Sequence, residues 1–236
     1  MLIDTLPLIL FETPMVERTF TDELREEASE IWEAIFSHPY LAEMADGPLP
    51  LERFKEYVRQ DYAYLAEFAR CLGLAAAKAD DMETMRIFTS LMNGCLTGEV
   101  ERLEELSERL GIPLDVLRET ELAPANLAYT RHLLHVAYSG SVGEIVAAML
   151  PCMWSYQMIG ERLAGKTEHP IYGEWCATYA SKEYADLVDW FRDLTDRCAE
   201  GAGEAIRERM RRHFVLSSRY EYMFWEMAYR EEEWPV

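Results

Sequence analysis

The sequence is short of positive charge. Its 236 residues include 23 lysines and arginines against 43 aspartates and glutamates, which gives a formal net charge of -20 at pH 7. Such a surface repels polyanions, so nucleic acid is not expected as a partner. The one basic cluster, residues 207–212, is interleaved with glutamates and followed by His213. We interpret it as a solvated helix face.

Paired cysteines are also lacking. Five cysteines occur, an odd number, widely spaced and without a CxxC pair, which argues against a disulfide scaffold or a zinc knuckle and favours a reducing compartment. The apolar stretch over residues 6–11 follows Asp4, contains Pro7, has no basic lead and is too short to span a bilayer. We expect a soluble, cytoplasmic protein without a membrane partner. The cysteines are Cys71, Cys95, Cys152, Cys176 and Cys198.

Several motifs of catalytic and cofactor sites are missing. No histidine follows a glutamate at the Glu-x-x-His spacing of di-iron bundles, and neither a serine-nucleophile elbow nor a glycine-rich phosphate loop is present. His132 and His135 form an HxxH pair, but the sequence offers no convincing third or fourth ligand. We therefore expect neither a metal nor a cofactor.

What is present is helical periodicity almost throughout. Strand-like alternation and repeats of solenoid length are absent from the sequence, which favours a single-domain, all-α bundle over residues 21–236 after an N-terminal extension, residues 1–20. Helices are expected over 21–37, from Pro50 through Phe68, over 81–110 with an interruption near 94–98, and over 126–138, 142–164, 171–180, 181–199 and 203–231.

Local signals set the expected helix ends. Thr21 is a plausible N-cap, and a loop is expected after His38 and Pro39, through Pro48. Ser141 with Glu144 forms a capping box, and Gly111 is expected to end a helix.

Cys152 is the first candidate for chemistry. It follows Pro151 in a long apolar helical pattern, and the residues four and seven positions away on its face are apolar or aromatic, so the thiol is expected to face inward. A thiol in that position is either core filler or a sheltered nucleophile. The neighbours on this face are Ile145, Ala148, Tyr156 and Ile159.

Two acids interrupt other apolar stripes. Asp61 lies between Phe54 and Phe68 on one helical face, and Glu221 lies among small and aromatic residues on another. Burial raises the pKa of a carboxyl, which makes Glu221 a usable general acid at neutral pH. The alternative is structural: each acid is held by internal hydrogen bonds, Glu221 by a neighbouring tyrosine, for stability only.

Five ordered segments carry a resemblance to a known family. They are His38-Pro39-Tyr40, residues 46–50 (DGPLP), residues 60–65 (QDYAYL), residues 150–156 (LPCMWSY) and residues 217–225 (SSRYEYMFW). Together with the intervening chain from Trp32 to Tyr229, they resemble the TenA family, the thiaminase II proteins.

The resemblance implies a fold similar to haem oxygenase, without haem, assembled as a homotetramer. It also implies hydrolysis of 4-amino-2-methylpyrimidines, from aminomethylpyrimidine to hydroxymethylpyrimidine and ammonia in thiamin salvage, with thiamin itself as a possible substrate. The family's nucleophile falls on Cys152, the acid that anchors the pyrimidine on Asp61, and the acid/base on Glu221. Its pocket positions fall on Tyr64, Tyr129, Tyr156, Tyr179 and Phe224.

The match has two departures. Leu103 stands where members commonly have a histidine, four residues after the glutamate matched by Glu99, and Pro48 replaces a frequent threonine. Both are expected to affect pocket walls or subunit contacts rather than the reaction. Two other functions stay open: a non-catalytic pyrimidine-binding or regulatory protein of the same fold, and a haem or metal bundle.

Overall fold

Helices are the only regular elements that the computed structural model contains over the residues it describes, 18–236. This confirms the all-α prediction; most of the expected N-terminal extension, residues 1–17, lies outside the described residues. None of the helices over 18–236 is long and apolar enough to cross a membrane. The elements are α1 (Phe20–Glu27), α2 (Ser29–Phe36), α3 (Pro39–Asp46), α4 (Leu51–Lys78), α5 (Met82–Gly94), the π-helix η1 (Cys95–Glu99), α6 (Val100–Leu110), α7 (Leu114–Arg118), α8 (Pro124–Ser139), α9 (Val142–Leu163), α10 (Pro170–Tyr179), α11 (Lys182–Glu200) and α12 (Glu204–Arg230).

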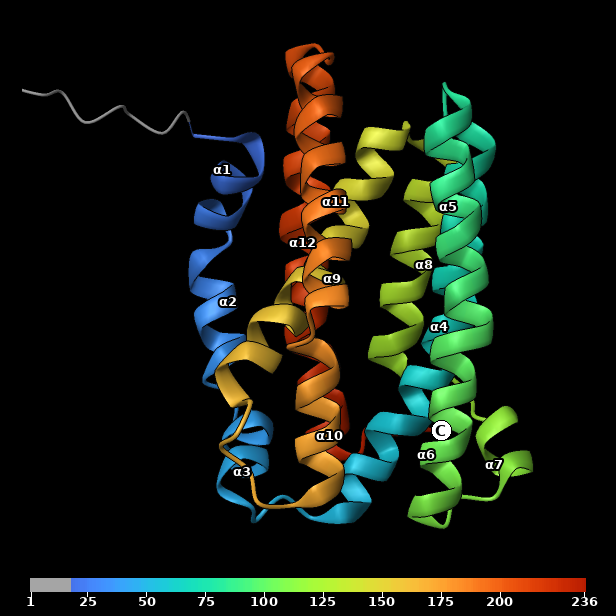
Figure 1. The fold of residues 1–236 in the computed structure, drawn as a ribbon, viewed down its shortest axis with the longest axis vertical. Coiled ribbons are helices and arrows are strands. Elements are labelled where there is room, and N and C mark those ends of the chain that lie inside the picture. The colour runs from blue at the N-terminus through green and yellow to red at the C-terminus, as the bar shows by residue number, and fades with distance from the viewer. Residues whose placement is uncertain (1–17) are drawn as a thin grey trace, which may run out of the picture.

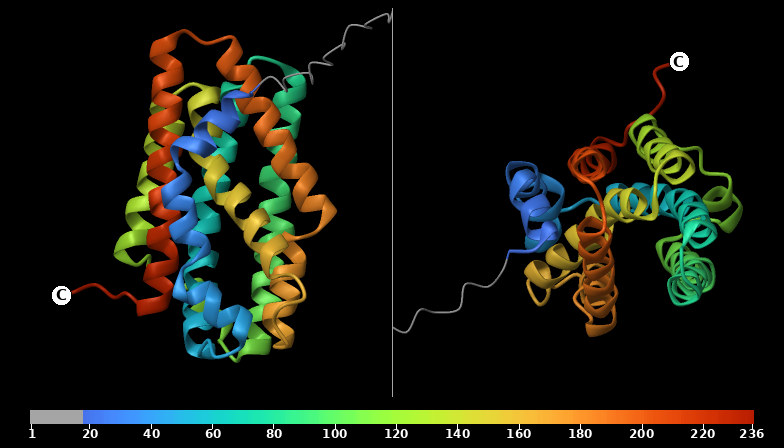
Figure 2. Two further views of the ribbon diagram at one scale, coloured as in Figure 1. Left: turned by 90° about the vertical axis from the view of Figure 1, so that its left-hand side faces the viewer. Right: turned by 90° about the horizontal axis from the view of Figure 1, so that it is seen from above.

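Helix α9 is the centre of the bundle. It packs against α12, α11, α10 and α8, and the views from the side and from above show it crossing behind α11 and between its neighbours (Figures 1 and 2). Its residues are buried on nearly all sides, and a Cβ at Gly160 would lie 2.7 Å from the backbone of Tyr179 and Ala180. The absence of a side chain there lets α9 meet the end of α10 closely.

The other long helices flank this centre. Helix α4 packs against α5 and α8, while α1 and α2 cover α12 from the other side (Figure 1). The apolar stripe predicted on α4 is buried, from Phe54 through Asp61 to Phe68. Acidic Asp61 is therefore carried into the interior by the hydrophobic residues around it.

Several predicted ends are confirmed. Ser141 caps α9 and forms the reciprocal capping box with Glu144, and Gly111 ends α6 in the left-handed conformation, with φ 73°. The predicted interruption near 94–98 is the π-helix η1, a single turn of the kind that often occurs at functional sites.

Other expectations were wrong. The loop expected after His38 and Pro39 is largely helix α3, because the His38 side chain accepts a hydrogen bond from the Tyr40 amide and proline fits the first helical turn. Thr21 is not a cap: Thr19 caps α1, and the buried Thr21 donates its hydroxyl and amide to Asp196.

The single helix expected over 21–37 is divided at Ala28 into α1 and α2, and the short helix α7 was not expected at all.

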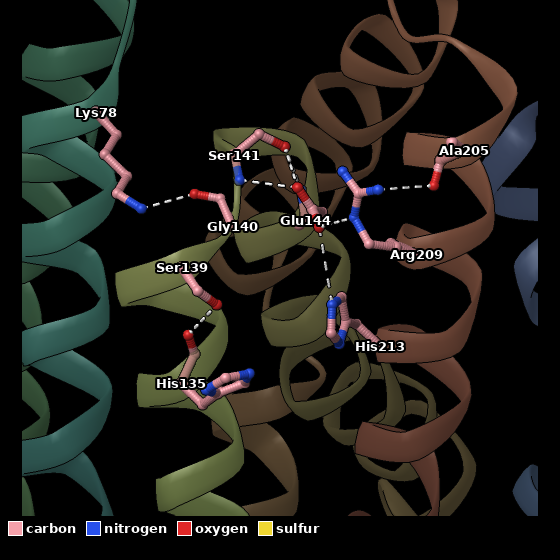
Figure 3. A network of polar contacts seen from close by, with 9 residues as sticks. All are labelled: Lys78, His135, Ser139, Gly140, Ser141, Glu144, Ala205, Arg209 and His213. Atoms are coloured by element: carbon pink, nitrogen blue, oxygen red, sulfur yellow. Dashed lines mark hydrogen bonds and ion pairs between the residues drawn. The ribbon is translucent and has the colours of Figure 1, made fainter.

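The basic cluster on α12 is more than a solvated face. Arg209 donates to Glu144 at 2.7 Å, and Glu144 also accepts from the amide and hydroxyl of Ser141 (Figure 3). Arg211 pairs with Glu23 at 2.8 Å. These contacts tie α12 to the turn before α9 and to α1.

Candidate active site

A cavity of about 280 Å³ lies inside the bundle, with walls from α4, α5, η1, α6, α8, α9, α10, α11 and α12. Its volume is close to the lower end of the roughly 300–1,000 Å³ common for small-molecule sites. It is lined by all eight residues that the sequence suggested for a site: Asp61, Tyr64, Tyr129, Cys152, Tyr156, Tyr179, Glu221 and Phe224.

The thiol of Cys152 comes from the middle of α9. Its neighbours in the helix are buried, whereas the cysteine is partly exposed and lines the cavity. Burial raises the pKa of Cys152 well above its usual range, and the charge of Glu221 adds to the rise. The Cys152 thiol is therefore neutral at pH 7.

The carboxyl of Asp61 comes from α4. The Tyr57 hydroxyl, one turn earlier, donates to Oδ2 at 3.4 Å and in turn accepts from the Trp175 indole at 3.3 Å. Burial raises the pKa of Asp61 to about 7; the Glu99 carboxyl adds to the rise, and Arg102 and the Tyr57 hydrogen bond oppose it. Asp61 is thus poised to exchange a proton with a ligand near neutral pH.

The carboxyl of Glu221 comes from α12 and is 2% exposed. The Tyr129 hydroxyl of α8 donates to Oε1 at 2.6 Å, across two helices. Burial raises the pKa of Glu221 to about 8, which the Tyr129 hydrogen bond opposes and the Asp61 charge promotes. This is a carboxyl able to give and take a proton near pH 8.

Aromatic rings form much of the remaining wall. The Tyr64 ring lies 5.4 Å from that of Tyr129 and 5.9 Å from that of Phe224, and the rings of Tyr156 and Tyr179 lie 5.0 Å apart. The buried Tyr64 hydroxyl has no hydrogen-bond partner among residues 18–236, so it is free to bond to a ligand. Flat rings with a few polar atoms suit a small heteroaromatic ligand.

Sequence reasoning missed two charged residues of this wall. Glu99, at the end of the π-helix, and Arg102, one turn later, both line the cavity. Burial raises the pKa of Glu99, and Arg102 opposes the rise. The pair of glycines at 94 and 98 was the available signal, because it marked the irregular turn that carries Glu99.

Both departures from the family pattern lie outside the cavity wall. Leu103 is buried without lining the cavity, and Pro48 is exposed between α3 and α4. Over residues 18–236, no group of three or more histidine, cysteine, aspartate or glutamate side chains is arranged to hold a metal ion.

Comparison with known proteins gives consistent matches. The sequence model of the TENA/THI-4/PQQC family matches residues 25–231. An aminopyrimidine aminohydrolase from Halalkalibacterium halodurans is 39% identical over 219 residues, which cover 92% of this chain and 98% of the relative.

Solved structures agree with these matches. A TenA homologue from P. horikoshii OT3 superimposes with a TM-score of 0.85 at 38% identity, covering 90% of this chain and 99% of that one. A second structure is a domain with a heme oxygenase-like fold from Shewanella denitrificans. It is 11% identical and superimposes with a TM-score of 0.71 over 89% of this chain and 92% of that one, so it shows a similarity of fold only.

Proposed function

Because the chain belongs to the TENA/THI-4/PQQC family, we propose that it hydrolyses 4-amino-2-methylpyrimidines, converting aminomethylpyrimidine to hydroxymethylpyrimidine and ammonia. The observation that carries the proposal is the meeting of Cys152, Asp61 and Glu221, from three helices, at one small aromatic cavity. Thiamin, which bears the same ring on a larger leaving group, is the second proposed substrate.

Asp61 anchors the pyrimidine. Its carboxylate accepts hydrogen bonds from the exocyclic amine and from the adjacent ring nitrogen once that nitrogen is protonated. The pKa of Asp61, about 7, favours such a shared proton near neutral pH. The protonated ring is electron-poor and open to attack by a thiolate.

Glu221 relays two protons in turn through the proposed reaction, first from the thiol to the amine and then from water to the thiolate. The Cys152 thiol gives its proton to the Glu221 carboxylate, and Sγ forms a bond to the ring carbon next to position five, while an electron pair moves to the protonated ring nitrogen. That pair then expels the substituent: the bond from the exocyclic carbon to nitrogen breaks, and Glu221 protonates the amine, which leaves as ammonia.

Water completes the cycle. It bonds to the exocyclic carbon and gives a proton to Glu221, and the bond from Sγ to the ring then breaks. The released thiolate takes the proton back from Glu221, so that the enzyme returns to its starting state and the net reaction replaces the amine by a hydroxyl.

Hydrolysis of aminomethylpyrimidine and thiamin, measured side by side on the purified chain, tests the proposal. We expect turnover of the first substrate, lost in Cys152→Ala and kept in Cys198→Ala, which removes another partly exposed thiol that is outside the cavity wall. Binding of either pyrimidine without any turnover would contradict the enzyme assignment and favour a binding or regulatory protein.

The same family premise leads us to propose a homotetramer in the cytoplasm, with one helical domain over residues 21–236. Five free cysteines support the reducing compartment. The mass of the native assembly in solution tests the tetramer.

A further inference from the structure

A second cleft, of about 470 Å³, lies on the outside of the bundle between α8 and α12. Three histidines and two arginines line it, an unusual gathering of basic groups in a chain of net charge -20. Figure 3 shows His135 on α8 and His213 on α12, with the His213 ring directed at Glu144. The lining residues are Glu27, His132, His135, Arg212, His213, Val215, Leu216 and Arg219.

The two arginines carry uncompensated charge. Within residues 18–236, neither Arg212 nor Arg219 forms an ion pair, whereas Arg209 and Arg211 on the same helix are paired with glutamates. Both unpaired side chains are exposed and line the same cleft. They leave two guanidinium groups available to a bound anion.

The histidines add neutral donors. The rings of His132 and His213 lie 5.5 Å apart, and His132 Nε2 is buried without a hydrogen-bond partner among the described residues. Burial lowers the pKa of His132 to about 4. Burial also lowers the pKa of His213, and the Glu144 carboxylate, whose Oε1 lies 3.9 Å from His213 Nε2, opposes this lowering. At pH 7 these rings are uncharged and can each donate one N–H to an oxygen ligand.

We propose that this cleft is a binding site for a small organic phosphate. The arginines and histidines match the oxygens of a phosphate group, and Val215 with Leu216 forms an apolar wall for the rest of the molecule. The acidic surface elsewhere, with Glu27 at the cleft itself, favours a small ligand over a polyanion.

The cleft is separate from the proposed active site. The two cavities share no lining residue. The Tyr220 ring lies between them, 5.3 Å from the Tyr129 ring of the first cavity and 5.6 Å from the His132 ring of the second. The proposal therefore does not depend on the hydrolase assignment.

Calorimetric titration of the full chain with phenyl phosphate tests the site. We expect one molecule bound per chain, and a Kd raised about tenfold in Arg212→Gln and in Arg219→Gln, as expected for a lost charge-assisted hydrogen bond. Arg230→Gln, which removes an exposed charge of the same helix outside the cleft, should leave the Kd unchanged. Inorganic phosphate should bind more weakly, because it does not use the apolar wall.

Four results would overturn the site. They are no binding of phenyl phosphate, an equal loss of affinity in Arg230→Gln, displacement of phenyl phosphate by saturating hydroxymethylpyrimidine, and inorganic phosphate binding as tightly as the ester. Binding of Zn²⁺ in place of phenyl phosphate would also overturn it, in favour of a histidine metal site.

Discussion

Replacing Tyr129 by phenylalanine isolates the hydrogen bond that tunes the proposed acid/base. The tyrosine hydroxyl donates to Glu221 Oε1 at 2.6 Å and thereby lowers the pKa of Glu221, which burial has raised to about 8. A hydrogen bond to a charged group contributes roughly 1.5–3 kcal/mol, and one pKa unit corresponds to about 1.4 kcal/mol. Loss of this bond is therefore expected to raise the pKa of Glu221 further, by roughly one to two units.

In the proposed mechanism the reaction begins with ionised Glu221, so the variant should need a higher pH to work. We expect the acidic limb of the pH profile of kcat/KM to move up by roughly one to two units, with a loss of about 10-fold to 100-fold at pH 7 that is partly recovered at high pH. Phenylalanine keeps the ring contacts with Tyr64 and Tyr220.

The assay is steady-state hydrolysis of aminomethylpyrimidine from pH 6 to 10. Tyr220→Phe is the matched control, since this ring stacks on Tyr129 but is absent from the cavity wall, and its profile should equal that of the parent. A Tyr129→Phe profile with an unmoved or lowered acidic limb would refute the role of Glu221 as the group whose ionisation limits the reaction.

Three further predictions concern the same interior. Asp61→Asn should weaken pyrimidine binding and turnover by roughly 1–3 kcal/mol, and an unchanged Kd for hydroxymethylpyrimidine in calorimetry would contradict the anchoring role. Glu221→Gln should slow turnover by about a hundredfold or more, yet at pH 8 its free energy of unfolding should be roughly 1–3 kcal/mol higher than that of the parent. The folded-state pKa of Glu221 is raised, so the stability contributed by its protonated form is lost as pH rises toward and through about 8. Equal urea midpoints at pH 8 would contradict a cost of burying the charged carboxylate. Gly160→Ala should lower the free energy of unfolding by about 1–3 kcal/mol and raise KM, because the added methyl group displaces Tyr179. Gly98→Ala, which has open space around the added methyl group, should not destabilise the fold. Equal thermal midpoints for the two variants would contradict the close approach of α9 to α10.

The helical bundle could be predicted because burial imposes a period on the sequence. Long amphipathic or apolar stretches with capping signals, such as Ser141 with Glu144, specify both the helix and its start. The predictions were wrong where the same residue type is typical both of the end of one helix and of the start of the next, or where a helix is very short. Pro39 was taken as a stop after one helix, but it is the first residue of the next, and α7 is too short to show a period.

Part of the candidate site was predictable for the same reason. A single acid in an apolar stripe, as with Asp61 and Glu221, is costly to bury and therefore conspicuous. By contrast, Glu99 and Arg102 lie in a highly charged segment whose pattern is typical of a solvent-exposed helix. Their place on the cavity wall depends on the π turn before them, whose extra residue shifts the phase of the helix, and periodicity does not reveal that shift.

The central claim is that Cys152 and Glu221 work as one unit on a ring held by Asp61. Its most direct test is kcat/KM for aminomethylpyrimidine in Cys152→Ala, in Glu221→Gln and in the double variant, measured together. If the two residues share one proton and one intermediate, the double variant should be about as slow as the slower single variant. Losses that multiply in the double variant would show two independent contributions and contradict the claim.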